Sequence, residues 1–231
     1  MVGIMNKNKK MLLIYIFMLT VGQIVIVLIL SSIEEIGNRV GIPLVTEKNG
    51  LAITNITIYL ILLVSVCLLF GSEIKQEWQQ GKGKIIKQIL GYGMGFCLAG
   101  IVIVGTAKIL GINTTENQEI VENIMVSANW LSSIISVVIA GPVVEEIVFR
   151  YIIMGKIRPY GRKKAIIISS VLFGILHLKG INIVEFFVYF ILGICLGIIY
   201  DKANKITVSI GVHCFYNVIN VAFFYVLINL G

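Results

Sequence analysis

Residues 183–200 read IVEFFVYFILGICLGIIY, and this run of 18 residues contains one charged side chain, Glu185, close to its beginning. An α-helix needs about 20 predominantly apolar residues to cross the hydrocarbon core of a bilayer. The run therefore predicts a membrane-spanning helix, with Glu185 as a charge at the membrane interface.

Six further apolar runs surround this one along the chain. The run 165–178 is the shortest, and its 14 residues would rise only about 21 Å as a helix. We therefore expect its helix to begin nearer Tyr160 or to end inside the protein. Together the runs predict an all-α fold, a polytopic integral membrane helical bundle of about seven transmembrane helices. The other runs are Met11–Ser31, Leu51–Phe70, Ile85–Ile109, Leu131–Ile153 and Ile206–Leu230.

Composition and charge support the same fold class. Hydrophobic residues make up 58% of the chain and charged residues 13%, against about 45–50% and about 25% in ordinary soluble domains. Of the 19 basic residues, 14 fall in segments that lie on one side of the membrane if the N-terminus is cytoplasmic, as the positive-inside rule requires. The net charge of +7 thus reports orientation and contact with anionic lipids, and no nucleic-acid partner is needed to explain it. These inner segments are 7–10, 75–87, 156–164 and 202–205.

Polar side chains interrupt three of the predicted spans. A charge near the bilayer centre costs a few kcal/mol, so such residues usually face the bundle interior and mark a functional path. Counted from the inner segments at 1.5 Å per residue, they lie about 12–20 Å deep, near the bilayer midplane. Because all share one level, we expect them to meet. They are Glu145, Glu146, Arg150, His177, His213 and Asn217, and the two histidines are the only ones in the chain.

The spacing of the acidic motif separates its two glutamates. Glu146 and Arg150 are four residues apart and face each other on a helix, which favours a charge-assisted pair. Glu145 is turned about 100° away and is available to take a proton. Pro142 removes the hydrogen bond to the Val138 carbonyl, so the helix is expected to loosen one turn before the glutamates and to admit water.

Four-residue spacing also places Phe173 with His177, and His213 with Asn217, on shared helix faces. Phe173 is interpreted as packing. Glu145 and His177 are suited to orient and deprotonate a water for attack on a peptide carbonyl. His213 and Asn217, from a separate helix, can donate hydrogen bonds to the developing oxyanion.

The three motifs in order, EExxxR at 145–150, FxxxH at 173–177 and HxxxN at 213–217, resemble the CPBP family. That family comprises CAAX prenyl endopeptidases and bacterial membrane proteins of bacteriocin processing and self-immunity. The resemblance extends from residue 131 to about residue 220, and no motif position departs from the pattern. It implies an intramembrane glutamate-dependent endopeptidase.

The resemblance also implies roles for single residues. It assigns water activation to Glu145 and His177 and the oxyanion site to His213 and Asn217. It assigns supporting roles to two further residues, Glu146 and Arg150. These roles agree with the spacing argument, and Phe173 joins the supporting set as the first residue of FxxxH.

We therefore expect two parts, residues 1–130 with three N-terminal spans and their loops, and residues 131–231 as the catalytic membrane core. The predicted activity is cleavage of a membrane-associated, prenylated or leader-bearing peptide or protein, such as a CAAX-type, bacteriocin or signal-peptide precursor. Its expected partners are membrane lipids and this substrate. The expected location is a cell membrane, multi-pass, in the bacterial plasma membrane.

Other interpretations remain open at this stage. No cofactor and no metal is expected, although two histidines and two glutamates can bind zinc; the lack of an HExxH helix and the charge of Arg150 argue against it. A non-proteolytic bacteriocin-immunity or partner-binding protein is the alternative outside enzymes, and the glycine-rich run 85–109 would supply its packing face. A transporter is a weaker hypothesis, because the polar groups cluster at one depth and form no ladder across the membrane.

Overall fold

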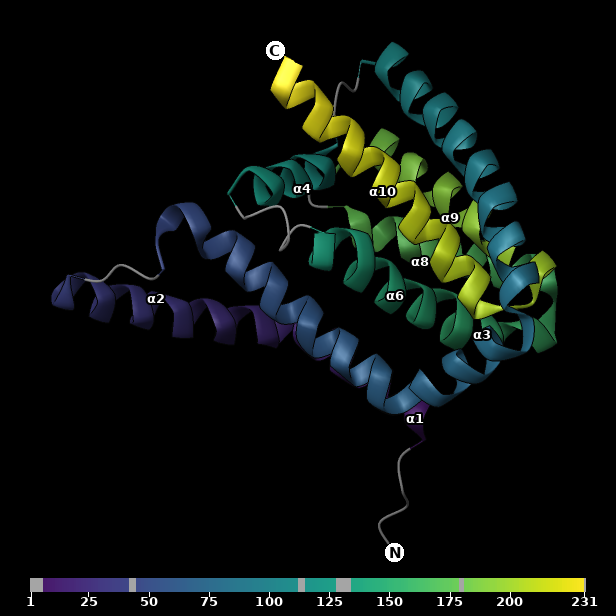
Figure 1. Cartoon of the computed structure of the whole chain (residues 1–231), viewed down its shortest axis with the longest axis horizontal. Helices are drawn as coiled ribbons and strands as arrows, with labels where there is room; N and C mark the ends of the chain where they lie inside the picture. Colours follow the sequence, from purple (N-terminus) through teal and green to yellow (C-terminus); the bar gives the residue numbers. More distant parts are fainter. Residues whose placement is uncertain (1–5, 42–44, 112–114, 128–133, 179–180, 231) are drawn as a thin grey trace, which may run out of the picture.

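The computed structural model describes residues 6–41, 45–111, 115–127, 134–178 and 181–230. Every regular element in these ranges is a helix (Figure 1), so the prediction of a helical membrane bundle is confirmed. The elements η1, η2 and η3 are π-helical and η4 is a 3₁₀ turn. In chain order they are α1 (Lys7–Phe17), η1 (Met18–Gly22), α2 (Gln23–Val40), α3 (Glu47–Ile109), α4 (Glu116–Ser127), η2 (Ile134–Ala140), α6 (Gly141–Glu145), η3 (Glu146–Met154), α7 (Gly155–Ile157), η4 (Arg158–Tyr160), α8 (Arg162–His177), α9 (Ile183–Ala203) and α10 (Ile206–Leu230).

Within the described residues, four continuous helical stretches are long and apolar enough to cross a membrane. The longest contains two of the predicted spans, because α3 continues through the inner segment with a kink where Gly81 adopts φ −148° and ψ 18°. α2 ends at Val40 and is capped by Gly41, whose φ of +74° is a left-handed conformation that glycine adopts without strain. The four stretches are Lys7–Val40, Ala52–Ile109, Ile183–Ala203 and Ile206–Val226.

The two remaining predicted spans take less regular forms. The fourth is a broken helix, residues 134–157, that changes from π to α to π and back to α as η2, α6, η3 and α7. The fifth is α8, whose 16 residues begin at Arg162 and end at His177, close to the predicted start near Tyr160. The predicted boundary between residues 130 and 131 lies outside the described residues, and the division of the chain at that point stays a prediction.

Contacts between distant segments bring the four predicted inner segments to one end of the bundle. Lys7 forms an ion pair with Glu73. The Glu77 carboxylate accepts hydrogen bonds from the first two backbone N–H groups of α10 at 3.1 and 2.9 Å. Arg158 pairs with Asp201 at 3.0 Å. We call this end of the molecule the inner end.

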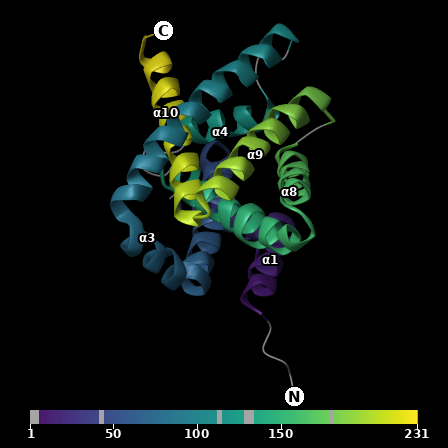
Figure 2. The ribbon, with the colours of Figure 1, turned by 90° about the vertical axis from the view of Figure 1, so that its right-hand side faces the viewer.

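Close helix packing rests on small residues. α8 and α9 lie side by side (Figure 2), with Gly193 of α9 against Ser170 and Phe173 of α8. The second half of α3 packs on α10, where Gly93 and Gly100 face the rings of Phe215 and Tyr216. These two glycines of the run 85–109 let α3 approach α10 closely. The other three glycines of that run, Gly91, Gly95 and Gly105, face open space.

The arrangement leaves α2 and the first half of α3 as an antiparallel hairpin that projects from the bundle (Figure 1). The base of the hairpin shares a core with the broken helix, since Met11, Leu62 and Phe149 belong to one buried apolar cluster. This cluster continues to Phe173 of α8, and it forms the apolar wall beside the predicted site.

Candidate functional site inside the membrane

The broken helix presents the two glutamates at a change of helical geometry. Pro142 is the second residue of α6, and Glu145 ends this α-helical turn. Glu146 begins the π-helical segment η3, which also carries Arg150. π-Helical segments are rare and occur often at functional sites. Consecutive helical residues point about 100° apart, so the two carboxylates point in different directions.

Glu146 and Arg150 form the buried charge pair that their spacing predicts. Both side chains are 0% exposed, and Arg150 Nη1 lies 3.3 Å from Glu146 Oε1. Arg150 Nη2 donates to the Gly193 carbonyl at 3.1 Å, and the guanidinium carbon lies 4.6 Å from the centre of the Phe173 ring. Phe173 therefore packs against the cation of the pair, a contact that adds a favourable cation–π interaction.

Two further donors complete the surroundings of Glu146. Ser209 donates its hydroxyl to Oε2 at 2.5 Å, and Nδ1 of His213 lies 3.0 Å from Oε1. A carboxylate beside an arginine is ionised and only accepts hydrogen bonds, so His213 carries a proton on Nδ1. Glu146 thus fixes the orientation of the His213 ring and presents its Nε2 edge to the rest of the site.

Glu145 lies between the two imidazoles. Its Oε2 is 3.9 Å from Nε2 of His177 and 3.9 Å from Nε2 of His213. The three side chains are between 9% and 14% exposed, so the cluster is shielded but reachable. The structure thereby brings together both histidines and both glutamates from the broken helix, α8 and α10, as the shared depth predicts.

The ring of His177 is held on three sides. Its Nδ1 lies 2.8 Å from the Phe173 carbonyl, which only accepts, so Nδ1 carries the proton and Nε2 faces Glu145. The Phe173 ring lies on one face with 4.2 Å between centroids. Tyr189 of α9 stacks on His177 with 4.5 Å between centroids and 19° between the ring planes.

Asn217 lies one helical turn beyond His213 and contacts a different element. Its amide nitrogen donates to the Val137 carbonyl of η2 at 2.9 Å. This bond ties α10 to the π-helical segment that precedes the glutamates. The predicted oxyanion role of Asn217 would use its second N–H and stays a prediction.

Several residues that contact the site were not predicted from the sequence. Ser209 lies four residues before His213, so the same four-residue spacing that selected Asn217 would have found it. Gly193 contributes only its carbonyl, and Tyr189 lies in a run rich in aromatic residues, so no pattern distinguishes them. Tyr59 of α3 lies close by as well: its ring and the Glu145 carboxylate come within 3.7 and 3.8 Å of the point where a Cβ on Gly141 would lie.

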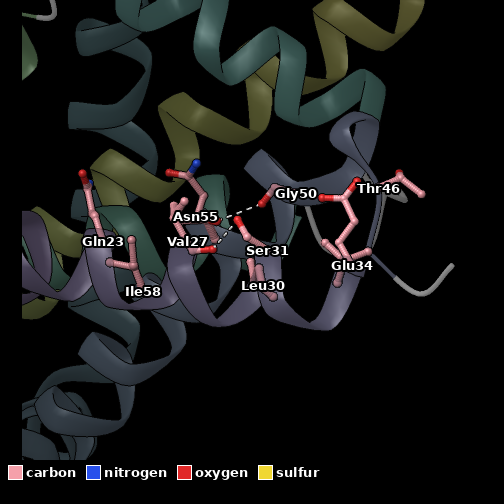
Figure 3. A pocket seen from close by; sticks show the side chains of 11 residues that line it. Gln23, Val27, Leu30, Ser31, Glu34, Thr46, Gly50, Asn55 and Ile58 are labelled. Atoms are coloured by element: carbon pink, nitrogen blue, oxygen red, sulfur yellow. Dashed lines mark hydrogen bonds between the residues drawn. The ribbon is translucent and has the colours of Figure 1, made fainter. Parts of the chain in front are cut away.

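A groove of about 390 Å³ opens between α2 and the first half of α3 (Figure 3). Its wall combines apolar side chains with amide, hydroxyl and carboxylate groups. Ile58 lines the groove and belongs to the buried apolar cluster that includes Val144 and Phe173, so this cluster links the groove to the helices that carry Glu145 and His177. The lining residues are Gln23, Val27, Leu30, Ser31, Glu34, Val45, Thr46, Gly50, Thr54, Asn55 and Ile58.

Within the described ranges, no group of three or more His, Cys, Asp or Glu side chains has the arrangement of a metal site. The expectation that the protein needs no cofactor stays a prediction.

These features define a class of protein: an all-helical membrane protein whose broken helix joins a buried ion pair to a cluster of one glutamate and two histidines. Residues 127–219 match the family model described as type II CAAX prenyl endopeptidase Rce1-like. The match covers about two-fifths of the chain and includes all three motifs, so the resemblance to the CPBP family is confirmed. No curated protein and no solved structure matches the chain.

Proposed function

We propose that this protein is an intramembrane endopeptidase that uses a glutamate- and histidine-activated water. The observation that carries the proposal is the position of Glu145 Oε2, 3.9 Å from Nε2 of both His177 and His213. The family match supports the general class, that of endopeptidases of the CAAX type. The roles of the single residues follow from their hydrogen-bonding capacity.

Glu145 and His177 are suited to hold the attacking water. With the proton of His177 on Nδ1, both Nε2 and Oε2 are acceptors, and two acceptors 3.9 Å apart do not bond to each other directly. A water at an ordinary hydrogen-bond distance of about 2.8 Å from each can donate one O–H to Oε2 and the other to Nε2. Its lone pair then points away from the bases, and attack on a peptide carbonyl transfers one water proton to Glu145 or His177.

His213 is suited to stabilise the oxyanion that this attack creates. Its Nδ1 already donates to Glu146, so Nε2 becomes a donor when the ring is protonated. The Glu146 carboxylate lies 3.0 Å from Nδ1 and holds the ring so that Nε2 faces the site. A donor placed where negative charge develops lowers the barrier most when water is excluded, and the second N–H of Asn217 is the proposed companion.

The groove between α2 and α3 gives the proposed substrate a place beside the site. Gln23 and Glu34 both line it, and neither has a hydrogen-bond or ion-pair partner within the residues that the structure describes. A polar side chain within a membrane span usually faces a cavity or a substrate path. We infer that an extended segment of a membrane-associated peptide, prenylated or leader-bearing, lies here, because its backbone amides match the carboxamide of Gln23.

The test compares membrane peptides by mass spectrometry from bacterial cells that express the wild type or Glu145→Gln. The wild type should produce cleaved fragments that Glu145→Gln lacks, while both proteins accumulate in membranes to the same level. Glu35→Gln is the matched control, because Glu35 is exposed and pairs only with Arg39 among the described residues. It should retain the wild-type fragments.

The outcomes also separate the alternatives. Identical fragments from the wild type and Glu145→Gln would show that proteolysis does not depend on this carboxylate and would refute the proposal. A bacteriocin-immunity or partner-binding protein would protect cells equally well with Glu145→Gln and with both histidines replaced. The close packing of Gly93 and Gly100 against α10 already uses part of the glycine face on which such a partner would dock.

A further inference from the structure

Tyr189 is the aromatic neighbour of His177 that no motif includes. Its ring lies nearly parallel to the imidazole, with 4.5 Å between centroids and 19° between the planes. Phe173 covers the ring from the same helix at 4.2 Å with a tilt of 37°. The imidazole is therefore confined by two aromatic rings as well as by the hydrogen bond from Nδ1 to the Phe173 carbonyl.

This confinement fixes the one torsion that the hydrogen bond leaves loosely defined. The χ2 torsion of histidine is broad and lacks sharp staggered minima, so a bond at Nδ1 alone allows the plane to tilt. A tilt displaces Nε2, the atom on the far edge of the ring that faces Glu145 at 3.9 Å. A stacked partner on the face opposes that displacement directly.

Tyr189 is itself held by a residue from a different part of the chain. The Tyr189 hydroxyl lies 3.0 Å from Thr115 Oγ1. Thr115 precedes α4, and the same oxygen accepts the backbone N–H of Gln118 at 3.1 Å. Thr115 is thus the N-cap of α4, and its position is set by the helix that it caps.

We propose that Tyr189 is a positioning residue for His177, and that Thr115 holds Tyr189 in place from the start of α4. The catalytic consequence rests on the proposed endopeptidase function, whereas the structural coupling of these three residues does not. In this arrangement the outer connection between α3 and the broken helix takes part in the geometry of the site. A displacement of about 1 Å in a reacting group can lower a rate about 100-fold.

The coupling is testable without a substrate because the chain contains two histidines. Protein labelled with ¹⁵N and ¹³C in histidine and held in lipid nanodiscs gives NMR signals from two rings, assigned by His213→Gln. A ring stacked on an aromatic face is shielded. Tyr189→Leu should therefore move the carbon-bound ring protons of His177 downfield and leave the His213 signals in place.

Milder variants separate the two halves of the proposal. Tyr189→Phe keeps the stacked ring but loses the hydrogen bond to Thr115, so it should shift the His177 signals only part of the way towards those of Tyr189→Leu. Thr115→Val should shift them part of the way, and Thr115→Ser should restore them. Tyr160→Leu is the matched control, since Tyr160 is 78% exposed at the inner end, and it should change neither ring.

Unchanged His177 signals in Tyr189→Leu would overturn the proposal. A shift in Tyr189→Leu without any shift in Thr115→Val would overturn the part assigned to Thr115. If Tyr189→Leu fails to fold, unchanged His177 signals in both Tyr189→Phe and Thr115→Val would overturn the coupling. Should no fragment be cleaved by any form of the protein, the proposed function fails while these spectra still report the coupling.

Cleavage assays then measure how much Tyr189 contributes to catalysis. On a fragment identified by the peptide comparison, Tyr189→Leu should lower kcat about 100-fold with KM within about twofold, because binding and positioning are separate contributions. Tyr189→Phe should recover most of kcat. An equal loss in Tyr189→Phe and Tyr189→Leu would contradict positioning by the ring.

Discussion

Arg150→Met should destabilise the protein far more than the loss of an ordinary ion pair. Arg150 and Glu146 are both 0% exposed, with 3.3 Å between Nη1 and Oε1. Methionine preserves much of the apolar length of the side chain but leaves the Glu146 carboxylate buried without its cation. The same change removes the donor to the Gly193 carbonyl.

The size of the effect follows from the burial of the pair. Removing one partner of a buried ion pair costs about 3–5 kcal/mol, whereas replacing both partners is often close to neutral. In a chain of this size 1 kcal/mol shifts Tm by about 2–4 °C, so Arg150→Met should lower Tm by about 6–20 °C. The double variant Glu146→Gln with Arg150→Met should recover most of that loss.

The measurement is thermal unfolding of four proteins: the wild type, Arg150→Met, Glu146→Gln and the double variant. All are purified in one detergent and followed by intrinsic fluorescence. Arg39→Met is a close control, because Arg39 pairs with Glu35 at the same four-residue spacing but with side chains 75% and 65% exposed. An exposed helical pair contributes about 0.3–0.5 kcal/mol. If Arg150→Met shifted Tm no more than Arg39→Met, or if the double variant were as unstable as the single one, the assignment of a buried charge pair would be wrong.

Three further predictions concern packing, substrate and cofactor. Gly93→Ala should lower stability by about 1–3 kcal/mol, because its Cβ would lie 2.7 Å from the Phe215 ring, whereas Gly95→Ala meets nothing within 4 Å and should be neutral in the same unfolding assay. In peptide cleavage, Gln23→Leu should raise KM with kcat unchanged, while Ile24→Leu on the exposed side of α2 changes neither; a fall in kcat alone would contradict substrate binding in the groove. Cleavage should survive dialysis against a chelator, and loss of activity that zinc restores would contradict a mechanism based on side chains alone.

Much of the fold was predictable because hydropathy and charge depend on the membrane itself. The spans follow from the length needed to cross a bilayer, and the depth of each polar residue follows from a fixed rise per residue. Shared depth is what brought Glu145, His177 and His213 into one hypothesis before their contacts were known. The pairing of Glu146 with Arg150 was predictable from their spacing, because residues four apart on one helix lie on the same face.

The lateral arrangement of the helices was not predictable in the same way. Lipid and helix faces are both apolar, so hydropathy does not indicate which side of a span meets which neighbour. Tyr189 illustrates the difficulty, because the run that contains it has aromatic residues on every side. Asn217 illustrates it again: its partner is a backbone carbonyl of Val137, and a carbonyl has no signature in sequence.

The two adjacent glutamates differ in what their carboxylates contact. Glu146 forms an ion pair with Arg150 and accepts hydrogen bonds from Ser209 and His213, so its oxygens are committed and it is poorly suited to take a proton from water. Its contribution is to fix His213 at Nδ1, while the Phe173 carbonyl fixes His177 at the corresponding atom. Both imidazoles therefore present Nε2 to Glu145. Glu146 belongs to the buried ion pair and also holds His213 of the cluster proposed for catalysis, so a change at Glu146 should affect stability and ring orientation together.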